Sequence, residues 1–533
     1  MLPFVSSSGG QLVVDGQPFT FVGLNFWHAP WIAHSDPAKL RTELDLLHAA
    51  GARVLRITAL SEGPDEAPLQ AVPTHQPRPG VFNEAMFRAL DLVLDEMRAR
   101  GMRAILCLNN MWSWSGGFAM YLVWARGGTW RDIPYPSSHL SGYWDARPAG
   151  QRPQNTQADW NVYQEWASAF YSSPRAVALA DEAVRRVVAR TNAISGLDYA
   201  ADGTILAWEL CNEPRAVAPA EARTTARVAY LAWVRTTAAK IKQLSPRQLV
   251  AVGSEGTTPF EEYINVDFDA THALREIDVV TIHVWAQNWD WGDASGKARF
   301  ESALNQALPY IEDHAQRART LRKPLVIEEF GFARDMQSYD PQYSTMHRDA
   351  YYAALVRDAT RLGVSGVMPW AWSGKGRPRV HGGYWRPGDD FLGDPPHEPQ
   401  GWYSIYDTDE STLRLLREGR SMHATPPTPP WSPTPPSPPP EPVAAACHSD
   451  LVGDINVEAC EGWCSDTTHC VWCKCRGCGA RIGCGPPAAA RTCHSAEAGD
   501  FDYEACEAWC QPETAPEHCG FCKCRGCPAA RCS

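Results

Sequence analysis

ILAWELCNEPR, residues 205–215, is the stretch of sequence that decides the fold. It begins as a short apolar run and ends in Asn-Glu-Pro; neither Asn nor Pro continues a strand, so the strand ends near Glu213. Because side chains alternate along a strand, Trp208 lies on one face, while Glu213 and other small or polar residues lie on the opposite face. This pattern is typical of a barrel strand with helices outside it and a narrow interior. A carboxylate at the C-terminal end of such a strand lies where barrel enzymes carry out their chemistry; a glutamate that only closes a loop ion pair is the alternative.

A second apolar run with the same kind of ending favours the catalytic interpretation. KPLVIEEFGF, residues 323–332, ends in Glu328 and Glu329, followed by an aromatic residue and a glycine. Two strands that present carboxyl groups at one rim supply what glycoside hydrolysis requires. One group protonates the leaving oxygen, and the other attacks the anomeric carbon or activates a water.

These two motifs resemble those of glycoside hydrolase family 5 (clan A), in which Asn-Glu-Pro ends strand 4 and Glu-aromatic-Gly ends strand 7. The resemblance implies that Glu213 is the acid/base and that Glu329 is the nucleophile. Glu328 has no such assignment, and its opposite strand parity predicts that its side chain points elsewhere, but it stays the alternative to Glu329 as nucleophile.

Strand-like apolar runs alternate with amphipathic helical patterns along the first 423 residues. Alternation of this kind implies a parallel sheet, and eight repeats imply a closed barrel, so the expected class is α/β with a (β/α)8 TIM barrel over residues 1–423. The strands are expected at residues 19–27, 53–59, 103–110, 205–213, 249–255, 279–285, 324–330 and 366–372.

Three segments that follow strands are too long for simple connections: residues 61–80, 111–174 and 374–405. They are expected to wall a cleft at the catalytic rim. Sequences at this rim, among them TIHVWAQNW (281–289) and DPPHEPQGWYSIYDTDEST (394–412), are similar to those of the family's endo-β-1,4-mannanases.

The same resemblance implies a set of substrate-binding residues. Arg56 would keep the nucleophile ionised, and Asn212 would hold the sugar 2-hydroxyl. His283 would lie at the floor of the cleft. Trp370 would form the platform beneath the −1 sugar, with Trp372 as the alternative platform.

Three further side chains complete the predicted binding set. Trp285 occupies a position where many relatives carry a Tyr that bonds the nucleophile, so either another hydroxyl substitutes or Trp285 only shapes the pocket. Trp112 and Trp114, directly after the third strand, are expected to contact sugar, and Asn110 at the end of that strand is a binding candidate.

Other polar residues in the barrel have mainly structural interpretations. Glu255, at the fifth strand, has two possible roles that the sequence does not separate: it either contacts substrate or binds neighbouring cations. Glu209 is expected to be a buried partner of Arg56. Cys107 and Cys211 are expected to be buried free thiols.

The composition narrows the possible partners. A formal net charge of −12 argues against nucleic acid or an anionic membrane surface. No apolar run approaches the length of a transmembrane helix. No cofactor and no metal are implied, and a monomer is expected.

The cysteines are concentrated at one end of the chain. Sixteen of the 18 lie between Cys447 and Cys532, which is typical of disulfide-rich modules made in an oxidising compartment. A secreted, extracellular protein is therefore expected. The N-terminus lacks the basic and long apolar regions of a secretion signal, so the simplest account is that the signal is absent from this sequence.

The tail divides into a Pro-rich linker at residues 424–443 and two repeated Cys-rich modules at 444–485 and 490–533. Disulfides are favoured over zinc in each module. Trp463 and Trp509 recur at one position in the two copies. They either bind cell-wall polysaccharide or form the small core of each module.

These features together predict a secreted, retaining endo-β-1,4-mannanase that hydrolyses mannan, glucomannan or galactomannan. An endo-β-1,4-glucanase or another β-glycanase of the same family is the alternative. An inactive wall-binding protein is the alternative from another class, although no catalytic carboxylate is missing.

Overall fold

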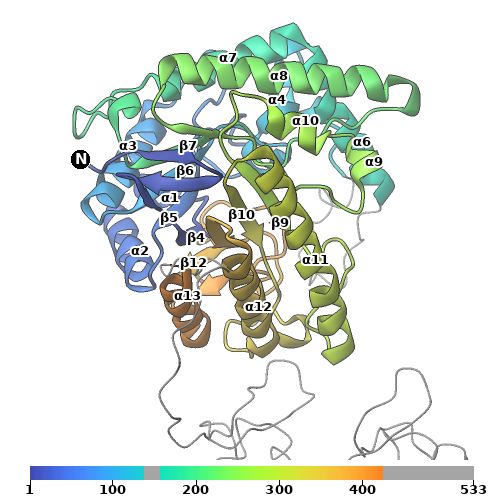
Figure 1. Cartoon of the computed structure of the whole chain (residues 1–533). Coiled ribbons are helices and arrows are strands. Elements are labelled where there is room, and N and C mark those ends of the chain that lie inside the picture. The colour runs from blue at the N-terminus through green and yellow to red at the C-terminus, as the bar shows by residue number, and fades with distance from the viewer. Residues whose placement is uncertain (137–156, 424–533) are drawn as a thin grey trace, which may run out of the picture. The chain divides into compact units, whose positions relative to one another are not determined.

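The computed structural model describes residues 1–136 and 157–423. The predicted linker and both Cys-rich modules lie outside the described residues. Within the described part, eight parallel strands alternate with helices, and the helices surround the strands (Figure 1). The predicted (β/α)8 barrel is therefore confirmed.

All eight predicted barrel strands are present, each shorter than expected. They pair in the order β8-β7-β6-β5-β4-β11-β10-β9. The backbone N–H of Asp278 donates to the Val250 carbonyl at 2.9 Å, and that of His283 donates to the Glu255 carbonyl at 3.2 Å, so the two end strands are also linked. The strands are β4 (Phe21–Asn25), β5 (Val54–Thr58), β6 (Arg103–Cys107), β7 (Ile205–Glu209), β8 (Leu249–Ala251), β9 (Val280–Val284), β10 (Leu325–Phe330) and β11 (Gly366–Pro369).

The outer helices form where the sequence has an apolar stripe of helical period. In α3 (Glu84–Ala99), Asn83 accepts a hydrogen bond from the Ala85 N–H and caps the helix, while Met86, Leu90 and Met97 are fully buried against the barrel. The other main outer helices are α2 (Pro37–Ala49), α7 (Pro174–Val188), α8 (Arg223–Leu244), α11 (Lys297–Leu321), α12 (Met346–Leu362) and α13 (Glu410–His423).

A small antiparallel sheet closes the end of the barrel away from the catalytic rim. Its strands are β1 (Val5–Ser8), β2 (Gln11–Val14) and β3 (Gln17–Pro18), and the chain turns between the last two at Asp15 and Gly16. Val5 and Leu12 pack against residues from the starts of the barrel strands.

Further short elements lie in the connections between the strands and helices of the barrel. They include α1 (Ala29–Ser35), α4 (Gly117–Ala125), α6 (Gln157–Ser168), α9 (Glu261–Ile264), α10 (Phe268–Ala273), β12 (Trp372–Gly374) and β13 (Ile405–Tyr406). The segment after β10 is tied to the two last helices by a buried charge cluster: Arg334 and Arg348 both donate to the carboxylate of Asp409.

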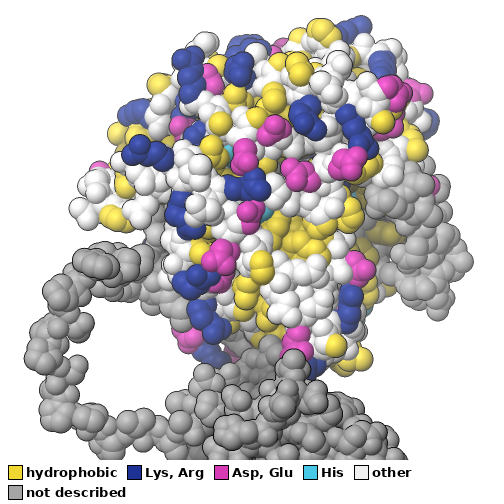
Figure 2. All heavy atoms as spheres, turned by 45° about the vertical axis from the view of Figure 1, so that its right-hand side comes forward, with side chains coloured by type: hydrophobic (Ala, Val, Ile, Leu, Met, Phe, Trp, Pro, Cys, Tyr) yellow, Lys and Arg dark blue, Asp and Glu magenta, His cyan; other side chains and the backbone are white. Residues whose placement is uncertain are grey.

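The surface shows no single dominant charge. Basic and acidic side chains are interspersed over the face drawn in Figure 2, among patches of hydrophobic groups. None of the described helices is long and apolar enough to cross a membrane.

Candidate active site

The ends of the barrel strands bring the predicted catalytic residues together. Arg56 lies on β5, Asn212 and Glu213 follow β7, His283 lies on β9, and Glu329 lies on β10. All five side chains are buried in the mouth of the barrel.

Glu213 is held by its backbone and by both carboxyl oxygens. Its φ of 52° lies in the left-handed region, and its N–H donates to the Gly253 carbonyl at 2.9 Å. Oε2 accepts a hydrogen bond from the Trp112 indole at 2.7 Å, and Oε1 lies 2.7 Å from Nδ1 of His283. The side chain is therefore fixed with one face toward the cleft.

Glu329 is held by a cation and by an indole. Arg56 Nη1 donates to Oε1, and the Trp285 indole donates to Oε2 at 3.2 Å. The sequence left open whether another hydroxyl replaces the usual Tyr or whether Trp285 only shapes the pocket. In the structure the Trp285 N–H itself is the donor.

Arg56 is fixed on its other side as predicted. Glu209 accepts from Nε at 2.7 Å and from Nη2 at 2.6 Å, which confirms the expected buried ion pair. The oxygens of Asn212 and Asn25 accept from the same guanidinium at 2.7 and 3.2 Å. An arginine with so many fixed partners keeps its position and its charge.

The two candidate catalytic carboxyls are close together. Glu213, His283 and Glu329 each place one atom within 4.8 Å of the other two. They are the one group of His and acidic side chains among the described residues close enough to share a metal ion. The same spacing suits a pair of reacting carboxyls, which needs no metal, so we assign none.

Burial and neighbouring charges shift the pKa of both candidate catalytic carboxyls. Burial raises the pKa of Glu213, opposed by Arg215 and Trp112. Burial raises the pKa of Glu329 well above its usual value, opposed by Arg56, and the charge of Glu213 adds to the rise. Two carboxylates this close resist ionising together, so one proton stays in the pair. Arg56 donates directly to Glu329 and favours its ionised form, so we assign that proton to Glu213.

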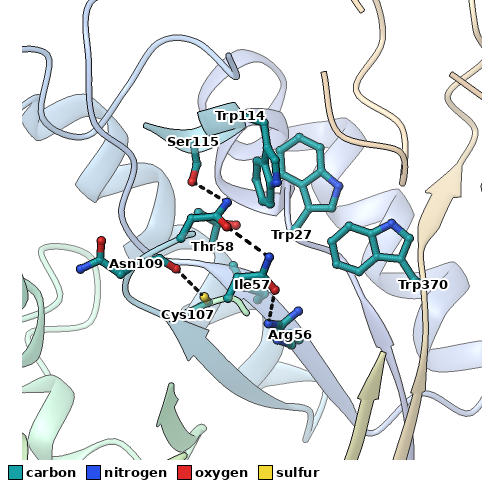
Figure 3. Close-up of a pocket in the computed structure, with 11 residues that line it drawn as sticks. Trp27, Arg56, Ile57, Thr58, Cys107, Asn109, Trp114, Ser115 and Trp370 are labelled. Carbon is teal, nitrogen blue, oxygen red and sulfur yellow. Dashed lines mark hydrogen bonds between the residues drawn. The ribbon is translucent and has the colours of Figure 1, made fainter. Parts of the chain in front are cut away.

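A small recess opens beside these groups (Figure 3). The Trp27, Trp114 and Trp370 rings lie on one side of it (Figure 3), and Asn110 and Asn212 are also among the lining residues. Asn212 Nδ2 donates to Asn110 Oδ1 at 3.2 Å. Trp114 and Trp370 were both predicted from the sequence. Trp27 was not, although an aromatic residue just after a barrel strand was a usable signal.

The sequence of this chain matches a known protein family. The family model described as GH family 5 beta-mannosidase-like matches residues 2–424. The chain belongs to this family. As a family 5 member with both carboxyls in place, it is a glycoside hydrolase.

Individual relatives agree with this family 5 assignment. A mannan endo-1,4-beta-mannosidase 3 from Solanum lycopersicum is 30% identical over 399 residues, which is 72% of this chain and 86% of the relative. A glycoside hydrolase family 5 mannosidase from Rhizomucor miehei is 31% identical, with a TM-score of 0.68, and the match covers 79% of this chain and 98% of that one. The endo-beta-1,4-mannanase of Thermotoga petrophila, at 23% identity and a TM-score of 0.56, shares the fold; the match covers 77% of this chain and 78% of that one.

Two site predictions for this family 5 chain are wrong. Trp372 is fully buried away from the recess, and its indole donates to Glu43 on α2 at 3.0 Å, so it cannot replace Trp370 as a platform. Glu328 does not point away from the interior. A bulge in β10 places His283 opposite Glu329 and leaves Glu328 unpaired, so Glu328 also enters the barrel, with Oε2 3.9 Å from Nε2 of His283.

The contacts of three other groups of predicted residues are as follows. Glu255 holds a cation, because both of its oxygens accept from Arg215, at 2.7 and 2.6 Å. Trp112 contacts the Glu213 carboxyl and lies against the Arg215 guanidinium, which is 4.9 Å from its ring centre. Cys107 and Cys211 are buried free thiols, as expected.

Two groups at the site had no clear sequence signal. Trp160 of α6 packs edge-on against Trp112, with ring centres 5.3 Å apart, and also against His397, at 6.2 Å. Next to that histidine, Glu398 has a buried Oε2 without a hydrogen-bond partner among the described residues. Burial raises its pKa, and the charges of Asp394, Glu329 and Glu213 add to the rise, so Glu398 lies within electrostatic reach of the catalytic pair.

Proposed function

We propose that the chain is a retaining endo-β-1,4-mannanase. The observation that carries the proposal is the pair of carboxyls, Glu213 and Glu329, with oxygens within 4.8 Å of each other. Retaining enzymes place the two groups about 5–5.5 Å apart, and inverting enzymes leave about 6.5–9.5 Å for a water. The short separation supports double displacement.

In this mechanism Glu213 gives its proton to the leaving glycosidic oxygen while Glu329 attacks the anomeric carbon. The C–O bond to the leaving sugar breaks as a bond from Glu329 to the anomeric carbon forms. The Glu213 carboxylate then takes a proton from an entering water, whose oxygen displaces Glu329. Both carboxyls return to their starting states.

The surrounding contacts suit each group to its task. Arg56 and the Trp285 N–H stabilise the ionised Glu329, which must remain a carboxylate to attack. Burial lowers the pKa of His283 to about 3, with Arg56 acting in the same direction, so the imidazole is neutral and does not compete for the proton on Glu213. We assign Asn212 and Asn110 to sugar hydroxyls and Trp370 to the face of the −1 sugar.

The preference for mannan rests on the relatives. The curated relatives are named mannan endo-1,4-beta-mannosidases, and the relative from Rhizomucor miehei was solved in complex with mannosyl-fructose. We propose mannan, glucomannan or galactomannan as substrate, ahead of other β-1,4-glycans.

The test follows one reaction on four soluble substrates: mannan, glucomannan, galactomannan and carboxymethylcellulose. We expect reducing ends from the first three, a fast fall in viscosity, and β-configured product at the earliest times by proton NMR. First product with the α configuration would contradict retention. Preferential cleavage of carboxymethylcellulose would contradict the substrate class.

One observation favours a second candidate, an exo-acting β-mannosidase. The segment that carries His397 and Glu398 packs on Trp160 of α6 beside the catalytic pair. A carboxyl so placed could end the cleft and bind the hydroxyls of a terminal mannose. Mannopentaose labelled at its reducing end separates the two: an endo enzyme releases labelled di- and trisaccharides at once, whereas an exo enzyme releases mannose and leaves labelled tetrasaccharide first.

We also propose that the protein is secreted and that its tail binds wall polysaccharide. The support is the sequence of residues 424–533, with its linker and its paired cysteine patterns. Residues 443–533, correctly oxidised, should bind insoluble mannan or cellulose, and changing both Trp463 and Trp509 to Ala should remove that binding. Undiminished binding by a folded double variant would assign these two residues to the core instead.

A further inference from the structure

Glu328 is a buried carboxyl that the reaction described above does not use. Along β10, Ile327 pairs with Ile282 and Glu329 pairs with His283, so Glu328 is the extra residue of a bulge. The Asn25 side chain donates to its carbonyl at 2.8 Å and fixes the bulge. Two adjacent glutamates therefore both face the barrel interior, against the alternation of a regular strand.

The Glu328 carboxyl and Nε2 of His283 face each other in the barrel interior, where the Thr281 side chain also acts on the carboxyl. Neither Glu328 oxygen has a hydrogen-bond partner among the described residues, and neither does Nε2 of His283. Oε2 lies 3.9 Å from that nitrogen. A shift of about 1 Å would bring the two atoms within ordinary hydrogen-bonding distance.

The local charge requires one of these carboxyls to be neutral. Glu209, Glu328 and Glu329 all face Arg56, the one guanidinium among them. Arg56 donates hydrogen bonds to Glu209 and Glu329, whereas the oxygens of Glu328 accept none within the described part of the chain. Burial raises the pKa of Glu328 well above its usual value, and the charge of Glu209 adds to the rise, while Arg56 and Thr281 oppose it. Glu328 is therefore the carboxyl that keeps its proton.

We propose that Glu328 is a positioning residue: as a neutral acid it donates its O–H to Nε2 of His283 and so keeps the imidazole proton on Nδ1. Nδ1 lies 2.7 Å from Glu213 Oε1 and 3.3 Å from Glu329 Oε2. The proton on Nδ1 then donates to both catalytic carboxyls. In the other tautomer a lone pair would face the Glu329 carboxylate and repel it.

The proposal rests on the proposed function, because its kinetic consequence concerns the two carboxyls of that reaction. Nδ1–H stabilises negative charge on Glu329 before attack and on Glu213 after its proton has left. Loss of Glu328 would free His283 to change tautomer. The result would be slower chemistry with unchanged substrate binding.

The test compares two substitutions of nearly equal size in the full chain. In E328Q the amide is neutral and still donates an N–H to Nε2, so kcat/KM should stay within about 3-fold of the unsubstituted enzyme and the pH profile should not move. In E328M the donor is gone. We expect kcat to fall about 10- to 100-fold with KM unchanged, and the acidic limb of the profile to move to higher pH as Glu329 loses a hydrogen bond.

A second readout does not depend on any substrate. The infrared difference between the unsubstituted chain and E328Q at neutral pH should contain the carbonyl band of a protonated carboxylic acid. The same pair of changes at the exposed Glu221 is the matched control: its difference spectrum should contain carboxylate bands and no acid band, and its kinetics should not change.

The outcomes separate this proposal from the proposed function. Full activity of E328M, a shifted pH profile in E328Q, or a carboxylate band in place of the acid band would each overturn the role of Glu328. If E328M does not fold, the pH profile of E328Q and the infrared band still test the role of Glu328. A chain without activity on any β-1,4-glycan would remove the proposed function, while the infrared result would still report the protonation of Glu328.

Discussion

Replacing Glu62 with glutamine should change how the stability of the barrel depends on pH. Glu62 lies in the segment after β5 and is fully buried. Its Oε2 accepts from the Gly117 N–H, at the start of α4, at 2.9 Å, and its Oε1 lies 2.9 Å from the Tyr121 hydroxyl. That hydroxyl also lies 3.2 Å from Gln76 Oε1, so its single proton can serve one of the two acceptors. A protonated Glu62 satisfies all three groups.

The direction and size of the effect follow from the pKa of Glu62. Burial raises this pKa from 4.5 to about 8, against the opposing hydrogen bonds from Gly117 and Tyr121. Between these two pH values the folded chain holds a proton that the unfolded chain has lost. The contribution of Glu62 to stability is therefore fully present below pH 4.5 and declines by about 1.4 kcal/mol per pH unit until pH reaches the folded pKa.

The amide introduced by E62Q would remain neutral and could donate to Tyr121 at every pH. The free energy of unfolding of E62Q minus that of the unsubstituted chain should thus rise with this slope from pH 4.5 to about 8 and be flat above it. Urea unfolding at closely spaced pH values, followed by tryptophan fluorescence, measures the difference, with Glu221→Gln as an exposed control. A difference that does not vary with pH would refute the assignment of a protonated Glu62.

Four further outcomes are expected. Glu213→Ala should lower kcat/KM by at least about 1,000-fold while the melting temperature stays nearly constant; retained activity would exclude Glu213 as the acid. Trp372→Phe removes the donor to Glu43 and should cost about 1–3 kcal/mol in urea unfolding, with KM unchanged, whereas a raised KM would return Trp372 to the site. Asp409→Ala leaves two buried guanidinium groups without their carboxylate and should cost about 3–5 kcal/mol; unaltered urea curves would show that the cluster adds nothing. A chain that ends after His423 should hydrolyse soluble mannan at the full-length rate, and a folded but inactive barrel would place part of the site in the tail.

Much of the site could be predicted because its residues lie at strand ends. The alternation of strands and helices identified the rim to which Glu213 and Glu329 belong, the family resemblance added Arg56, and the parity of the strand before Glu213 placed Glu209 inside the barrel. The same alternation predicted the wrong face of the strand for Glu328. A one-residue bulge shifts the alternation, so that every later residue of the strand points to the opposite face of the sheet. No local pattern in an apolar run marks where a bulge occurs.

The remaining errors concern contacts between distant segments. Trp370 follows β11 and Trp372 begins β12, and sequence alone does not show that one faces the recess while the other meets Glu43 on α2. Likewise, the approach of Trp160 to His397 joins two long loops whose paths depend on tertiary packing. Such loops carry specificity without a periodic signal.

The left-handed backbone of Glu213 has a consequence for the evolution of this enzyme. A residue with a side chain at φ 52° costs about 1–3 kcal/mol relative to a relaxed conformation, and glycine largely escapes that cost. A chain with glycine at this position should therefore melt at a higher temperature than the active chain. Selection for thermostability alone would favour this inactive variant. Directed evolution of a more thermostable enzyme must therefore screen for catalytic turnover in the same round.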